Sequence, residues 1–250
     1  MQTSEKGVKS RTPKQNLRRL EKLLAVIIET NTQTYFNNKN SPNPRKPKWV
    51  GEVDRAYEEL ATLLANDDKL AIELVEKSLE KAGGHVSSPV SIMSDYEERY
   101  EFPWRVVNLA RLLILADEKI ASSGKRAADD APALAALYPA AVNSCYDIIF
   151  KDSNSSEGLL DAMGYVAMKH YLKLVPLLPE KERYDILEKH YAFLRSFMRT
   201  GYRFPEILEK GAREIVELLE RPGGEQEIWS RSAALWGMKL RDEDKPIFYK

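Results

Sequence analysis

The chain has 250 residues, of which 43% are hydrophobic and 30% are charged, and its formal net charge at pH 7 is zero. This composition is typical of a folded globular protein with one large domain or two small ones. The single cysteine excludes an internal disulfide framework, and without a secretory signal it indicates a reducing, cytoplasmic location. The longest uncharged run, residues 131–146, is interrupted by two prolines, so we expect no membrane span.

The charge is distributed unevenly along the chain. Residues 1–48 contain eleven Lys and Arg against three Glu, a net charge of +8, so the other residues together carry −8. Residues 1–13 have little apolar content and end in an Arg-Thr-Pro sequence, which predicts a flexible basic arm. We therefore expect a basic N-terminal region attached to an acidic body.

The first helix is predicted over residues 14–34. Its apolar residues recur at spacings of three and four, which places Leu17, Leu20 and Leu24 on one face. Residues 37–48 follow with three prolines, which lack a backbone donor, and four asparagines, which favour turns. This composition predicts an extended basic loop after the first helix.

Two amphipathic helices are predicted next, over residues 50–65 and 69–81. The Asn-Asp-Asp sequence at 66–68 separates them, and an aspartate in this position caps the helix that follows. The Gly-Gly pair at 83–84 is typical of a helix end. A short helix is expected near residues 94–100.

The middle of the chain is its most apolar part. Residues 104–121, 132–150 and 158–178 carry apolar side chains around most of the helix circumference, which predicts three helices at the centre of the fold. Gly124 is expected to end the first of them. Asp129 and Asp130 are expected to cap the second.

Amphipathic patterns return in the C-terminal third. Further helices are predicted to start at Pro179 and Phe204 and to cover residues 225–239, followed by an irregular tail at 241–250. The expected fold is therefore all-α, with about 8–10 helices in a single domain over residues 14–240. A globular bundle and a helical-repeat-like stack both fit this pattern, and the lack of a fixed repeat period favours the globular form.

The basic N-terminal region is the main functional candidate. Lys and Arg side chains that neutralise phosphates bind nucleic acid in a salt-dependent manner. The aromatic residues Tyr35, Phe36 and Trp49 flank the basic loop, where their rings are placed to stack on bases. The alternative is a solvated N-terminus that only keeps the protein soluble. The candidate binding residues are Lys9, Arg11, Lys14, Arg18, Arg19, Lys22, Arg45, Lys46, Lys48 and Trp49.

A second candidate lies on the predicted helix that starts at Pro179. Arg183 and His190 are spaced Arg-x6-His, which resembles the loose Arg-x(4–6)-His pattern of the all-helical HEPN-type ribonucleases. In that family the Arg and His of two protomers form a composite cleavage site, so the resemblance implies a ribonuclease or toxin-type enzyme. Tyr184 departs from the family, which usually has a polar residue after the arginine. The alternative is a surface arginine and a rim histidine without catalytic roles.

No cofactor or metal site is expected. The three histidines show neither the His-x3-His nor the Glu-x2-His spacing of helical metal sites. The Ser-Ser-Gly-Lys-Arg sequence at 122–126 lacks the first glycine and the final hydroxyl residue of a phosphate-binding loop. Cys145 lies in an apolar run, which predicts a buried, unreactive thiol.

Trp229 and Trp236 are seven residues apart and therefore share one face of the last predicted helix. They either dock this helix onto the body or form part of an oligomer contact. We expect a non-enzymatic helical interaction or scaffold protein with a protein partner or a second copy, and with nucleic acid as the anionic partner of its basic region. The alternatives are the HEPN-like ribonuclease and a structural or assembly subunit.

Overall fold

The computed structural model describes residues 12–42, 45–87, 101–153 and 162–179, together with residues 182, 183, 185, 186 and 190. Helices account for 84% of the described residues and none of these residues lies in a β-strand, which confirms the predicted all-α fold. The helical elements in chain order are α1 (Pro13–Ile28), α2 (Thr32–Lys39), α3 (Lys48–Ala65), α4 (Lys69–Ser87), α5 (Phe102–Ser122), α6 (Ala127–Asp130), α7 (Pro132–Ala135), α8 (Tyr138–Ser153), α9 (Ala162–Leu174) and the 3-10 turn η3 (Val175–Leu177).

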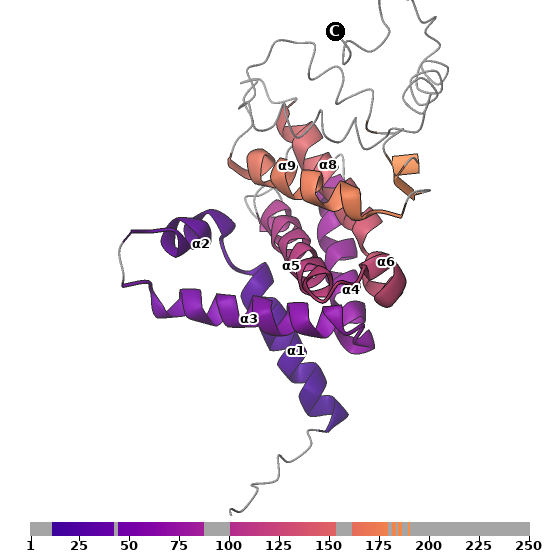
Figure 1. Ribbon diagram of the computed structural model, residues 1–250. Helices are drawn as coiled ribbons and strands as arrows, with labels where there is room; N and C mark the ends of the chain where they lie inside the picture. Colours follow the sequence, from indigo (N-terminus) through magenta and orange to yellow (C-terminus); the bar gives the residue numbers. More distant parts are fainter. Residues whose placement is uncertain are drawn as a thin grey trace, which may run out of the picture.

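Helix α5 lies at the centre of the described helices (Figure 1). It packs against α1, α3, α4, α8 and α9, and α8 and α9 also pack closely against each other. The predicted central position is therefore confirmed for α5, against which the other two apolar segments, α8 and α9, pack. The buried residues of α5 are Val106, Val107, Asn108, Leu109, Ala110, Leu112, Leu113, Ile114, Ala116 and Ile120.

The N-terminal segment forms two helices instead of the single one predicted over residues 14–34. A capping box begins α1, since Thr12 and Gln15 each bond the other's backbone N–H through their side chains. Helix α1 ends at Ile28, and the side chain of Asn31 accepts a hydrogen bond from the backbone of Thr34 at 3.0 Å, which caps α2. The predicted loop over residues 37–48 is shorter, because α2 continues to Lys39.

The turn between α3 and α4 agrees with the prediction. Asp67 adopts a left-handed conformation with φ of 55°, and the N–H of Asp68 donates to the carbonyl of Leu63 at 3.0 Å. The Asp68 side chain then accepts from the N–H of Ala71 at 3.0 Å and caps α4. The predicted helix end at residues 83–84 is wrong, because α4 continues through both glycines to Ser87.

The centre of the chain follows the predicted helices with two corrections. Gly124, with φ of 75°, ends α5 as predicted. Asp129 and Asp130 do not cap a helix at Pro132, because both lie inside α6, where the Asp130 carboxylate accepts from the N–H of Arg126 at 3.1 Å. The helix predicted over residues 132–150 is divided into α7 and α8.

Several predictions fall outside the described residues. These are the basic arm up to residue 11, the helix near residues 94–100, the helices beyond residue 200 with Trp229 and Trp236, and the C-terminal tail. None of the described helices combines the length and the apolar character that crossing a bilayer requires.

Candidate functional site

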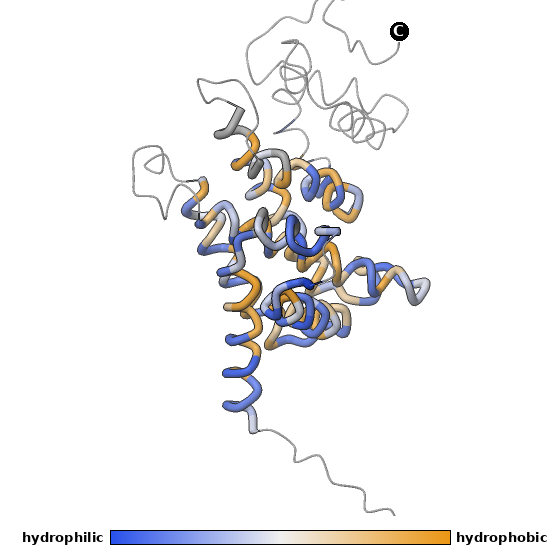
Figure 2. The backbone as a smooth tube through the Cα atoms, turned by 90° about the vertical axis from the view of Figure 1, so that its left-hand side faces the viewer, coloured by the Kyte–Doolittle hydropathy of each residue, from blue (hydrophilic) through white to orange (hydrophobic). Residues whose placement is uncertain are grey.

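Helix α1 presents a row of basic side chains to solvent. Lys14, Arg18 and Lys22 are all exposed and follow one another at intervals of four residues, so they lie along one face of the helix. The other face packs against α3 and α5. Figure 2 shows the hydrophilic first turns of α1 extending beyond the other described helices. The three cations, called the α1 basic row below, therefore share a rigid and accessible surface.

The other charged residues of α1 separate from this row. Arg19 forms an ion pair with Glu59 of α3 and is therefore turned toward the body. Glu21 is the one acidic residue in α1, and it lies outside the four-residue repeat. Within the described part of the chain, no ion pair neutralises the α1 basic row.

The basic loop residues occupy a different part of the surface. Arg45 and Lys46 are exposed just before α3, and Lys48 and Trp49 form its first turn. Figure 1 shows this end of α3 beside α2, well away from the first turn of α1. The basic residues that the sequence groups together are therefore divided between two places, while Lys9 and Arg11 lie outside the described residues.

The aromatic residues near the loop have different environments. Trp49 is 37% exposed and is accessible to a partner. Tyr35 is only 4% exposed, so the prediction that its ring stacks on bases is wrong. Its ring instead packs against that of Tyr57, with centroids 6.0 Å apart.

Arg183 and His190 both contact the helical body. The guanidinium of Arg183 donates to the carbonyls of Pro176 and Leu178 at 3.0 and 2.9 Å. His190 is buried and stacks on Tyr146, with ring centroids 3.7 Å apart. A histidine that cleaves RNA needs access to its substrate. No contact among the described residues supports the ribonuclease alternative, which stays a prediction.

Cys145 is buried, and this burial together with the charge of Asp147 raises the pKa of its thiol to about 12. A thiol with such a pKa stays protonated near neutral pH, and it is a poor nucleophile. The prediction of an unreactive core cysteine is confirmed. No group of three potential metal ligands occurs among the described residues.

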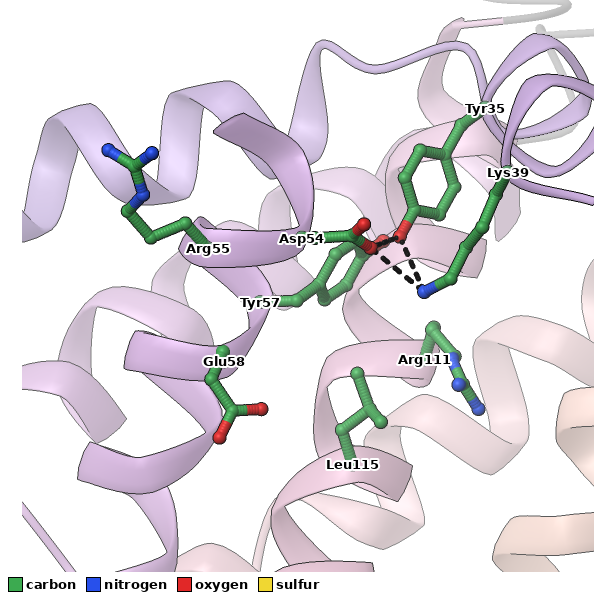
Figure 3. Close-up of a pocket in the computed structure, with 8 residues that line it drawn as sticks. All are labelled: Tyr35, Lys39, Asp54, Arg55, Tyr57, Glu58, Arg111 and Leu115. Atoms are coloured by element: carbon green, nitrogen blue, oxygen red, sulfur yellow. Dashed lines mark hydrogen bonds and ion pairs between the residues drawn. The ribbon is translucent and has the colours of Figure 1, made fainter. Parts of the chain in front are cut away.

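A polar pocket of about 430 Å³ opens between α2, α3 and α5 (Figure 3). Three side chains form its upper wall, and hydrogen bonds connect all of them. The ammonium of Lys39 donates to the hydroxyl of Tyr35 at 3.1 Å and to the carboxylate of Asp54 at 2.8 Å, and the Tyr35 hydroxyl donates to the same carboxylate. The residues that line the pocket are Tyr35, Lys39, Asp54, Arg55, Tyr57, Glu58, Arg111 and Leu115.

The hydrogen bonds of this trio fix its protonation state. Burial raises the pKa of Tyr35, and the neighbouring Asp54 raises it further, so the phenol stays protonated. Burial alone would lower the pKa of Lys39, but its bonds to Asp54 and Tyr35 raise it overall. Burial would likewise raise the pKa of Asp54, but bonds from Lys39 and Tyr35 lower it. A charged ammonium and a neutral phenol suit ligand binding better than nucleophilic or base catalysis.

The sequence does not reveal this pocket. Lys39 lies within the basic loop predicted over residues 37–48, and Asp54 and Arg111 belong to helices whose pairing the sequence pattern does not show. A signal was present in α3, where Asp54 is a polar residue directly beside the buried face formed by Val53 and Tyr57. In comparisons with family models, curated proteins and solved structures, no family, protein or structure matches this chain.

Proposed function

We propose that this protein is a helical interaction protein that binds the phosphate backbone of a nucleic acid through the α1 basic row. The observation that carries the proposal is that Lys14, Arg18 and Lys22 are exposed in line on one helix face. Eight residues of an α-helix rise by about 12 Å, so three positive charges follow one another within that length. A row of this kind suits contact with about three phosphates.

The attachment of α1 to the body supports this proposal. Leu20, Leu24 and Ile27 are buried on the inner face of the helix, so α1 is anchored to the body and its first turns continue from that anchored part as one helix. A rigid helix loses less conformational entropy on binding than a mobile tail with the same charges. The helical body then serves as the platform that presents α1.

A salt titration with the full-length protein tests the proposal. Binding of a fluorescein-labelled single-stranded RNA is followed by anisotropy between about 50 and 200 mM salt, for the wild type and for the triple variant Lys14→Gln, Arg18→Gln, Lys22→Gln. We expect the variant to bind at least about tenfold more weakly. The slope of log K against log salt should become shallower by about 2, since about three phosphate contacts are lost.

Helix α4 offers a control with the same change in charge. Lys69, Lys77 and Lys81 are exposed on α4, where exposed glutamates alternate with them. Replacing these three lysines with glutamine should change the affinity by no more than about twofold, because no uninterrupted basic row is removed. The proposal is wrong if the wild type does not bind at the lowest salt, or if the two triple variants lose affinity equally.

A further inference from the structure

We infer that the pocket between α2, α3 and α5 binds a small organic anion, with its phosphate or carboxylate group held by Lys39 and Arg111. This site is separate from the α1 basic row and does not depend on the proposed nucleic-acid binding. The pocket volume of about 430 Å³ is large enough for a metabolite-sized ligand. Figure 3 shows Lys39 and Arg111 on the same side of the pocket, one from α2 and the other from α5.

Both cations keep hydrogen-bond donors for a ligand. Lys39 has three N–H donors, of which Tyr35 and Asp54 take two. Arg111 has five donors, and its ion-pair partner Glu118 lies 4.0 Å away, beyond hydrogen-bond distance. Glu118 is also shared with Lys173 at 3.5 Å. A ligand with several acceptor oxygens is the natural partner of such a pair.

The acidic residues of the pocket already have cationic partners. Asp54 is bound by Lys39, and Glu58 forms an ion pair with Lys119 of α5. Apart from Arg55, whose guanidinium points away from Lys39 in Figure 3, the lining contains two cations and two anions. Because Lys119 neutralises Glu58 from outside the lining, the pocket favours an anionic ligand. A cationic ligand would have to displace one of these ion pairs.

The environment of the two cations strengthens an ion pair with a ligand. The side chains of Lys39 and Arg111 are only 38% and 26% exposed, so water screens them less than it screens a surface residue. The hydrogen bonds that Lys39 makes to Tyr35 and Asp54 hold its ammonium in place before any ligand arrives. The side chains of Tyr57 and Leu115 supply apolar surface for the organic part of the ligand.

The inference is tested by amide chemical-shift titration of the full-length, isotope-labelled protein at low salt. The probes are adenosine monophosphate, glutarate and uncharged adenosine, each added to about 10 mM, which detects millimolar dissociation constants. We expect one or both anions to shift resonances of α2, α3 and α5, and adenosine to leave them unchanged. Which anion binds more tightly distinguishes a phosphate site from a carboxylate site.

Two variants of pocket-lining arginines form a matched pair. Arg111→Gln should weaken anion binding roughly ten- to a hundredfold, because it removes a charge-assisted contact. Arg55→Gln should leave the affinity within about twofold, because Arg55 is exposed and Figure 3 shows its guanidinium directed away from Lys39. If Arg111→Gln does not fold, Lys39→Gln provides the same comparison.

Three results would overturn the inference. The first is that neither anion shifts the pocket resonances, and the second is that both arginine variants weaken binding equally. The third is that the triple variant of the α1 basic row abolishes the shifts, since the anion would then be bound on α1. Retained pocket shifts in that triple variant support the inference, whether or not it still binds RNA.

Discussion

His170 is a buried residue of α9 whose protonation opposes folding. Its Nδ1 donates to the carbonyl of Val166 at 2.7 Å, and the side chain lies inside the helical core. Burial lowers the pKa of the imidazole to about 4, although the bond to Val166 acts in the opposite direction. Three neighbouring cations lower the pKa further by repulsion: Arg111, Lys173 and Lys169.

This environment predicts a loss of stability in mild acid. Between about pH 6.5 and pH 4 the unfolded chain binds a proton at His170 that the folded chain does not, so the free energy of unfolding should fall by up to about 3 kcal/mol. His170→Asn keeps an N–H donor for Val166 and has no titrating group, so it should lose less stability over this range. Urea unfolding of both proteins at about pH 7.5 and 4.5 measures this loss. An equal loss of unfolding free energy in the wild type and in His170→Asn would contradict the prediction.

At the scale of the helices, Gly83 sets how closely α4 approaches α8. A Cβ at this position would lie 2.4 Å from the hydroxyl oxygen of Ser144, which is buried and donates to the carbonyl of Ala140 at 2.8 Å. Gly84 is the neighbouring residue on the same helix, but a Cβ there would have no atom within 4 Å. The two adjacent glycines therefore have different functions in the fold.

The glycine pair predicts opposite effects of the same substitution. Gly84→Ala should stabilise the protein by about 0.5–1 kcal/mol through helix propensity alone. Gly83→Ala should destabilise it by about 1–2 kcal/mol, because Ser144 must give up its bond to Ala140 or the helices must separate. Urea denaturation measures both. Adding Ser144→Ala to Gly83→Ala should recover much of the lost stability. If Gly83→Ala is as stable as Gly84→Ala, α4 and α8 do not pack tightly at Gly83.

The same elements show what the sequence can and cannot predict. Val53, Tyr57 and Leu60 recur at helical spacing within the helix predicted over residues 50–65, and α3 buries all three on one face. The break before Asn31 was missed because its side-chain cap competes with a helical pattern that continues through it. Gly83 was interpreted as a helix end because the sequence does not show which helix approaches it. The pocket was missed for the same reason, since its residues meet only when α2, α3 and α5 pack together.

At the scale of the whole molecule, Asn108 connects the centre of the fold to α1. It is 1% exposed in α5, and its amide donates to the carbonyls of Ile27 and Thr30 at 2.9 and 2.8 Å. The Ile27 carbonyl lies in the last turn of α1, where it also accepts from the N–H of Thr30 at 3.2 Å, and Thr30 lies just beyond the helix. The Asn108 backbone carbonyl also accepts from the hydroxyl of Tyr57 in α3 at 3.4 Å. One residue of α5 therefore holds two other helices.

Asn108→Ala should consequently lower the stability of the whole described bundle rather than loosen α1 alone. It removes two hydrogen bonds and leaves a cavity in the core, so we expect a loss of about 2–4 kcal/mol. The matched change Asn16→Ala, at an exposed position of α1, should alter stability by less than about 0.5 kcal/mol.

Hydrogen exchange measured by mass spectrometry distinguishes destabilisation of the whole bundle from local loosening of α1. If α5 unites the helices, the most protected amides of α1, α3, α5 and α8 lose protection together. If only α1 peptides exchange faster, the bond from Asn108 fixes that helix locally and the described helices do not unfold as one unit.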